Sequence, residues 1–153
     1  MNIIIVGCGK VGQALAEQLN EEGNNITVID LNPKKVNSVS ARLDIMGVVG
    51  NGATHMTQQE AGIKHADLLI AVTASDELNL LCCLIAKKAG NCHTIARVRT
   101  PEYSSELNFI KEELGLAMVI NPEMASADKI ARNLSLPAAI GVSRFARGRA
   151  EIL

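Results

Sequence analysis

With 153 residues and 48% hydrophobic content, the chain has the size of one domain and enough apolar material for a single core. Its net charge of −1 comes from interspersed acidic and basic residues, and its aromatic content is 2%, which argues against a nucleic-acid-binding protein. The longest strongly apolar run, 78–86, is too short to cross a bilayer. The four cysteines show neither a paired-thiol nor a zinc spacing, and without a signal peptide they suit a reducing cytosol.

The chain opens with an apolar run at 2–6, which predicts a buried strand, and an amphipathic stretch at 11–22 predicts a helix. Between them, residues 7–12 spell G-x-G-x-x-G. In this pattern Gly7 makes the tight turn, Gly9 lets the backbone approach a pyrophosphate, and Gly12 lets helix and strand pack closely. The N–H groups at the start of the helix then face the phosphates. Lys10 is expected to be a solvent-facing charge that weakly attracts the ligand.

The second apolar run, 26–29, ends at Asp30, 18 positions after Gly12. A nucleotide-binding turn of this type uses an acidic residue about 20 positions on to bind the ribose hydroxyls. The alternative is that Asp30 caps the next helix, but Asn32 can cap that helix equally well. We therefore predict the ribose role for Asp30, which favours NAD(H) or another adenine nucleotide over NADP, whose 2′-phosphate a carboxylate would repel.

The rest of the chain alternates predicted strands and helices. Pro33, Pro101 and Pro122 mark helix starts, and Gly23 marks a helix end. The alternation predicts a doubly wound α/β fold with helices on both faces of a parallel six-stranded sheet, and the glycine pattern predicts the Rossmann strand order 3-2-1-4-5-6. The further predicted strands are 45–49, 68–72, 94–98 and 117–120, and the further predicted helices are 33–43, 55–61, 76–89, 101–114 and 122–136.

In this strand order the carboxyl ends of strands 1 and 4 form the ligand crevice. Strand 4 ends in Thr73, Ala74 and Ser75, whose small and hydroxylic side chains leave room for a nucleotide. Helix capping is an equally good role for Ser75 and Asp76. The turn at 50–54, after strand 3, either meets the adenine or ribose or is a plain loop.

Two arginines, Arg97 and Arg99, stand at the carboxyl end of strand 5. Arginine suits phosphate recognition, and Arg97 is the better candidate because Arg99 lies further out. A solvated position at the strand end is the alternative for both.

The sequence lacks the residues that a catalytic site of the common dehydrogenase type needs. Tyr103 is followed four positions later by Leu107, so the Tyr-x-x-x-Lys acid–base pair is absent. Cys82 and Cys83 lie on an apolar helix and are interpreted as core residues rather than nucleophiles. The three isolated histidines have no second ligand at a metal spacing, and surface or helix-capping roles are expected for them. They are His55, His65 and His93. We therefore expect no catalytic residue, no metal site and no enzyme activity.

Several motifs together resemble the RCK/KTN family of cytoplasmic nucleotide sensors of potassium channels and transporters, and within it the N-terminal domain of TrkA-type regulators. The stretches that carry the resemblance are 2–12 (NIIIVGCGKVG), 26–30 (ITVID), 50–54 (GNGAT), 66–79 (ADLLIAVTASDELN), 95–99 (IARVR) and 121–123 (NPE). The match covers residues 1–136. It implies an RCK N-terminal dinucleotide-binding domain at 1–136, and a tail or the start of a crossover and C-terminal domain at 137–153.

The resemblance implies a regulatory subunit that binds NAD(H) or ATP/ADP and gates a TrkH-like membrane potassium transporter or channel. Such a subunit is cytoplasmic, lies at the inner face of the membrane through its partner, and forms dimers or tetramers. Glu123 would be a counterpart of a cation-binding glutamate in some relatives, although a helix N-terminal role suits it better. The candidate nucleotide-binding residues are Gly7, Cys8, Gly9, Lys10, Val11, Gly12, Asp30, Leu31, Asn51, Gly52, Thr73, Ala74, Ser75 and Arg97.

The helix at 77–88 is apolar on nearly every side, so it needs cover on more than one face. This pattern predicts contact with a second subunit as well as with the sheet, and complete burial within one chain is the alternative. For the whole chain, the alternative function is an NAD-dependent oxidoreductase, or the nucleotide-binding half of one.

Overall fold

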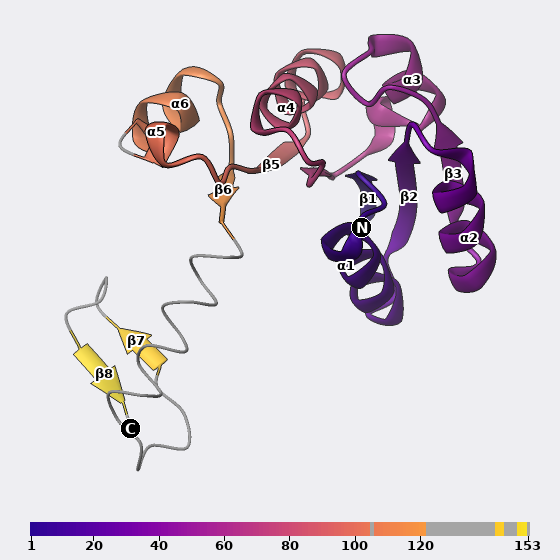
Figure 1. The fold of residues 1–153 in the computed structure, drawn as a ribbon, viewed down its shortest axis with the longest axis horizontal. Helices are drawn as coiled ribbons and strands as arrows, with labels where there is room; N and C mark the ends of the chain where they lie inside the picture. The colour runs from indigo at the N-terminus through magenta and orange to yellow at the C-terminus, as the bar shows by residue number, and fades with distance from the viewer. Residues whose placement is uncertain (105, 122–142, 146–149, 153) are drawn as a thin grey trace. The chain divides into compact units, whose positions relative to one another are not determined.

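The computed structural model describes residues 1–104, 106–121, 143–145 and 150–152. The chain divides into two units, Met1–Ile120 and Asn121–Leu153, which are described separately. Figure 1 shows the strands and helices along the chain. Among the helices described, none combines the length and apolar character needed to cross a membrane.

The first unit is built on a six-stranded sheet in the order β3-β2-β1-β4-β5-β6, and every pair in it is parallel. This confirms the predicted Rossmann order. The central strand β1 pairs with both β2 and β4, and residues 3–6 are buried because packed apolar clusters cover both faces of the sheet. The strands are β1 (Asn2–Val6), β2 (Asn25–Asp30), β3 (Met46–Val49), β4 (Leu68–Ala71), β5 (His93–Arg97) and β6 (Met118–Ile120).

Helices cover both faces of the sheet (Figure 1). On one face, α1 (Lys10–Glu21) and α2 (Pro33–Leu43) pack apolar side chains against one buried cluster. On the other face, a second cluster contains residues of the 3-10 turn η1 (Ile63–His65) and of α4 (Asp76–Gly90), and Ala61 at the end of α3 (His55–Glu60) belongs to it as well. The sheet is therefore the middle of three layers. The carboxyl ends of its strands lead directly into the loops that precede the helices.

The helix boundaries follow the local sequence. Asn32 begins α2, because its side chain accepts a hydrogen bond from the backbone N–H of Lys34 at 3.0 Å. Ser75 caps α4 in the same way, with Leu78 N–H at 3.2 Å. Asn91 ends α4 in the left-handed conformation with φ of 52°, which asparagine tolerates. The sequence therefore predicts the start of both helices.

The predicted helix at 101–114 differs from the structure, which has two shorter helices, α5 (Pro101–Ser104) and α6 (Leu107–Glu113). Glu106 precedes α6 with non-helical dihedrals, and its backbone N–H donates to Tyr103 O at 3.0 Å, which closes the first helix as a turn. The predicted helix at 122–136 and Glu123 lie outside the described residues. In the second unit, β7 (Ser143–Phe145) pairs antiparallel with β8 (Ala150–Ile152).

Candidate functional site

The glycine turn between β1 and α1 has the geometry that the sequence predicts. Gly7 adopts φ of +107°, a conformation that side chains rarely allow, and an added Cβ there would lie 3.0 Å from the backbone of Val72 and Thr73. A Cβ on Gly12 would collide with the carbonyl oxygen of Gly7. Around Gly9, by contrast, a Cβ would meet nothing within 4 Å. The backbone is thus tightly packed on both sides of Gly9 and open at Gly9 itself.

The first turn of α1 is available to a negatively charged ligand. Gly9 is its N-cap and offers no side-chain acceptor, and no acidic residue lies in the first turn. Lys10 is exposed, and Gln13 instead donates its side-chain amide to Cys8 O at 2.9 Å. Within the part of the chain that the structure describes, no side chain therefore competes for the backbone N–H groups at this end of α1, which is the arrangement that binds phosphate.

Asp30 lies directly beside the glycine turn. Its Oδ2 accepts from the backbone N–H of Cys8 at 2.7 Å, and its Oδ1 accepts from Asn32 N–H at 2.8 Å. Because Asn32 caps α2, Asp30 does not have that task. Two backbone donors thus fix the carboxylate, and its remaining lone pairs can accept ribose hydroxyls. Leu31, the next residue, is 66% exposed.

At the end of β4, Thr73 belongs to a partly buried hydrogen-bond network. Its hydroxyl donates to Asn79 Oδ1 at 2.8 Å, and its backbone N–H reaches the same oxygen at 2.8 Å. Asn79 is fully buried and was not assigned from sequence; the available signal was one amide in an otherwise apolar helix. Ala74 is exposed beside this network, and Ser75 caps α4 while contacting the Glu77 carboxylate at 2.8 Å.

Arg97 comes from β5 and is only 8% exposed. Its Nη2 donates to Thr73 O at 2.8 Å, and its Nε has no hydrogen-bond partner among the described residues. Within that part of the chain it also has no carboxylate at ion-pair distance. A buried positive charge without a counterion is costly, so this guanidinium is suited to an anion.

A shallow pocket of about 410 Å³ lies next to this network. At its wall Asp76 accepts from the hydroxyl and backbone N–H of Thr100, at 2.6 and 2.8 Å, and from Arg99 N–H at 2.8 Å. Burial raises the pKa of Asp76, but these hydrogen bonds and the Arg99 charge outweigh that effect and leave the pKa below its usual value. The pocket is lined by Ala74, Ser75, Asp76, Glu77, Arg99, Thr100 and Pro101.

The turn after β3 approaches the same edge of the sheet. Gly52 is buried against the Val6 side chain, where a Cβ would collide, and its carbonyl accepts from the Gln58 amide at 2.7 Å. Asn51 is exposed, and its Oδ1 accepts from Ala53 N–H at 3.0 Å. The structure therefore brings the three predicted loops to the carboxyl ends of β1, β3 and β4.

The cysteines are not suited to nucleophilic chemistry. All four are free and buried. Burial, together with the Asp30 charge, raises the pKa of Cys8 to about 11, and burial raises the pKa of Cys82 to about 12. The described residues also contain no group of three or more histidine, cysteine, aspartate or glutamate side chains that could hold a metal ion. The three histidines are exposed, as predicted.

Residues 3–122 match the model of the TrkA-N domain family. The chain is 39% identical to the Trk system potassium uptake protein TrkA of Halomonas elongata, over 100% of this chain and 34% of that protein. It is 31% identical to a TrkA homolog of Methanothermobacter thermautotrophicus, over 100% of this chain and 69% of that protein. The chain thus spans about a third of the length of the first relatives that it matches.

Solved structures show the same fold. The TrkA-N domain of the inner membrane protein YbaL from Escherichia coli superposes with a TM-score of 0.74 at 25% identity, over 90% of this chain and 96% of that chain. The GsuK channel bound to NAD superposes with a TM-score of 0.65 at 19% identity, over 78% of this chain and 21% of that chain.

Proposed function

Because the chain belongs to the TrkA-N domain family, we propose that it is the nucleotide-binding regulatory part of a potassium uptake system. The single observation that carries this proposal is the open backbone at Gly9 beside the fixed carboxylate of Asp30. The turn would receive the pyrophosphate, and Asp30 would bind the adenosine ribose. The names of the relatives support the potassium system.

The remaining site residues have proposed roles around the same ligand. The loop of Asn51 and Gly52 would face the adenosine half of the nucleotide, and Thr73, Ala74 and Ser75 would line the rest. Arg97 would meet a phosphate, which is supported by its buried charge without a counterion among the described residues.

The proposed ligand is NAD(H), or alternatively ATP or ADP. All share the adenosine diphosphate portion that the glycine turn and Asp30 address. Solved structures of GsuK, which has the same fold, hold NAD in one case and ADP in another, which supports an adenine nucleotide as the ligand class.

Calorimetric titration with NAD, NADH, ATP and ADP tests this proposal directly. Asp30→Asn is the most informative variant. The amide oxygen can still accept from one of the two backbone N–H groups, those of Cys8 and Asn32, while the negative charge is removed. Binding of at least one of the four nucleotides without turnover is the expected result. An empty site in the wild-type chain, or hydride transfer to a small substrate, would contradict it, and the second result would favour an oxidoreductase.

The proposed partner is a TrkH-like membrane potassium transporter or channel subunit, which would hold this cytoplasmic protein at the inner face of the membrane. Ligand binding would regulate the partner only if the nucleotide prefers one of two assembly states. Residues 1–136 would form the sensing domain, and residues 137–153 would be a tail or lead into a following domain. The proposed role is regulatory rather than catalytic.

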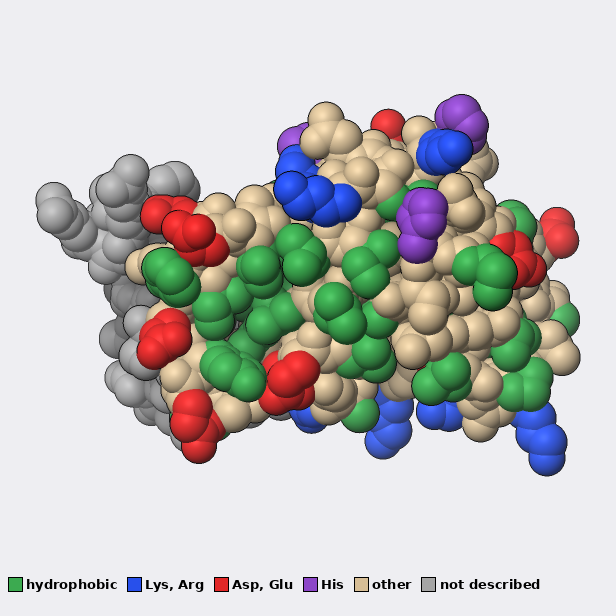
Figure 2. Space-filling view, turned by 90° about the horizontal axis from the view of Figure 1, so that it is seen from above, with side chains coloured by type: hydrophobic (Ala, Val, Ile, Leu, Met, Phe, Trp, Pro, Cys, Tyr) green, Lys and Arg blue, Asp and Glu red, His purple; other side chains and the backbone are tan. Residues whose placement is uncertain are grey.

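A homo-oligomer, as a dimer or tetramer, is the proposed assembly. Figure 2 shows hydrophobic side chains gathered on the face that carries α4 and α6, with acidic side chains at its border. On these helices Leu81 is 46% exposed and Phe109 is 64% exposed, while Leu78 and Ile110 are half-buried. Apolar surface of this kind is typical of an interface. Light scattering should give an oligomer, and a Leu81→Glu variant should shift it toward monomer; a wild-type monomer at high concentration would contradict this assembly.

A further inference from the structure

Two buried carboxamides connect α4 to two loops of the candidate site. Gln58 on α3 and Asn79 on α4 are polar, yet each is 0% exposed and lies beside an apolar cluster. A polar amide in such a place costs free energy unless hydrogen bonds compensate it. Their positions therefore need a structural reason.

Asn79 binds the ends of two neighbouring strands at once. Its Oδ1 accepts from the backbone N–H and the hydroxyl of Thr73, both at 2.8 Å. Its Nδ2 donates to Arg97 O at 2.9 Å and to Thr73 O at 3.3 Å. Since the Arg97 guanidinium donates to Thr73 O as well, one side chain fixes both the loop after β4 and the strand end that carries the buried cation.

Gln58 makes the matching connection on the other side of α4. Its Nε2 donates to Gly52 O at 2.7 Å and to Cys82 O at 2.9 Å. The loop after β3 is thereby attached to the middle of α4, across the buried cluster. Gln58 and Asn79 therefore each connect a helix to residues of other elements.

Neither amide is needed to begin its helix. Ser75 caps α4 through Leu78 N–H at 3.2 Å, and Thr54 caps α3 through Thr57 N–H at 3.4 Å. What the amides add is order in the loops, whose backbone lies beyond the last paired residues of β3 and β4. A loop that is held before the ligand arrives loses less conformational entropy on binding.

We propose that Gln58 and Asn79 are positioning residues of the nucleotide site, a claim that rests on the proposed function. Gln58 sets the loop that would face the adenosine half, and Asn79 sets Thr73 and Arg97, which would face the remainder of the nucleotide. The two amides therefore affect different parts of one ligand. This division separates a positioning role from general stabilisation, which would weaken binding of all ligands alike.

The test compares AMP, which carries only the adenosine half, with NAD by calorimetry on the full chain. Asn79→Ala should weaken NAD binding about tenfold and leave AMP binding within about twofold of wild type. Asn79→Asp is the second variant, because it keeps the acceptor for Thr73 N–H and loses the donor to Arg97 O. Gln58→Met should weaken AMP and NAD by the same factor, about fivefold, and should leave binding of inorganic pyrophosphate, which lacks the adenosine half, at the wild-type value; equal weakening of all three would overturn the role of Gln58.

Thr94→Val is the matched control. Thr94 is also 0% exposed, and its hydroxyl has no hydrogen-bond partner among the described residues, so the isosteric change removes a buried polar group without touching a site loop. It should bind AMP and NAD as wild type does.

Equal weakening of AMP and NAD binding in both Asn79 variants, or wild-type affinity for both ligands, would overturn the positioning role. Failure of both Asn79 variants to fold would also count against it, because Asn79 would then be a determinant of folding. If the wild-type chain binds neither AMP nor NAD, the proposed function itself fails.

Discussion

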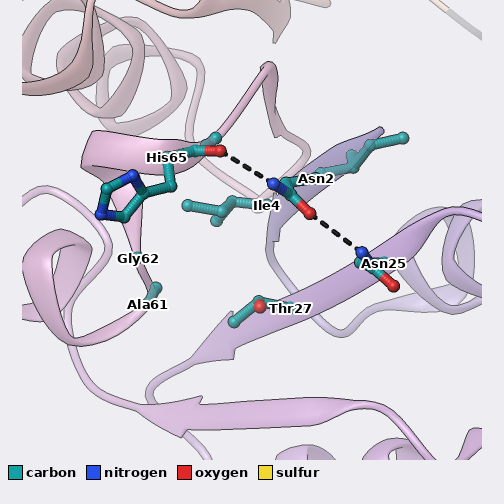
Figure 3. A pocket seen from close by; sticks show the side chains of 9 residues that line it. Asn2, Ile4, Asn25, Thr27, Ala61, Gly62 and His65 are labelled. Atoms are coloured by element: carbon teal, nitrogen blue, oxygen red, sulfur yellow. Dashed lines mark hydrogen bonds between the residues drawn. The ribbon is translucent and has the colours of Figure 1, made fainter.

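The amino ends of the strands form one side of the sheet, the amino edge, and their carboxyl ends form the other, the carboxyl edge. Each carries a pocket with polar side chains in its wall, but the hydrogen bonding at the two edges differs. At the amino edge a pocket of about 170 Å³ lies beside Asn2, Asn25 and His65. Figure 3 shows that these groups bind one another: Asn2 donates to His65 O at 3.0 Å and accepts from Asn25 at 3.0 Å. At the carboxyl edge, the buried Arg97 has an Nε without a partner among the described residues. Arg97 is not one of the residues that line the carboxyl-edge pocket, so the contrast is between the two edges: the amino edge pairs these polar groups with one another, and the carboxyl edge keeps, beside its pocket, a donor that no described residue uses.

The largest expected effects concern Gly12 and Gly9 at the carboxyl edge, where substitution should change stability in one case and nucleotide affinity in the other. Gly12→Ala should lower the free energy of unfolding by about 1–3 kcal/mol, because its Cβ meets the Gly7 carbonyl. Gly9→Ala should leave the unfolding curve unchanged, since space around it is open, but should weaken nucleotide binding at least about a hundredfold by blocking the approach to the backbone. Urea unfolding and calorimetry measure the two effects. Equal stability losses in both variants would contradict the difference in packing.

The next effect compares one carboxylate from each edge. Asp30 and Asp67 each accept a backbone N–H at 2.7 Å, from Cys8 and from Asn2. Asp30→Asn should weaken NAD binding by about ten- to a hundredfold, whereas Asp67→Asn should leave it unchanged. Asp30→Asn should also reduce the preference for NAD over NADP, because the repulsion of the 2′-phosphate is removed. A loss of affinity in Asp67→Asn as large as that in Asp30→Asn would remove the distinction between the edges.

A smaller effect is expected at the amino edge itself. Asn2→Ala removes the side-chain hydrogen bonds to His65 O and Asn25, and should lower the free energy of unfolding by about 1 kcal/mol. Nucleotide affinity should stay at the wild-type value. A nucleotide affinity that falls with Asn2→Ala would show that this edge takes part in binding.

The smallest effect depends on pH and concerns Asp76. Its pKa is lowered in the folded protein from an ordinary value of 3.8, so its stabilising contribution is present above that value and is lost as the pH falls further. The free energy of unfolding of Asp76→Asn should therefore depend less steeply on pH than that of wild type below about pH 4. Urea unfolding between pH 7 and pH 3 measures the two slopes, and identical slopes would contradict the assignment.

The alternation of strands and helices, together with the glycine turn, was sufficient to predict the strand order. The position of Asp30 was predictable because it depends on one apolar run and the residue that follows it. Asn32 and Ser75 were recognisable as caps for the same reason. The interruption at Glu106 was missed because it depends on a turn closed onto Tyr103, where the sequence pattern remained helical.

The candidate site was less predictable where contacts join distant segments. Asn79 meets Arg97 across 18 positions, and Gln58 meets Cys82 across 24. No spacing rule connects such pairs. An amide inside an apolar helix was the only local sign of Asn79, and it did not reveal which loops the side chain would bind.

The burial of the four free thiols has a practical consequence. The thiolate is the form that attacks an alkylating reagent, and burial both hides these sulfur atoms and raises the pKa of the Cys8 thiol to about 11. Modification therefore has to wait until the surrounding structure opens. The rate at which Cys8 is alkylated therefore reports how often the glycine turn opens, and the rate for Cys83 reports how often α4 opens. No probe has to be introduced by mutation.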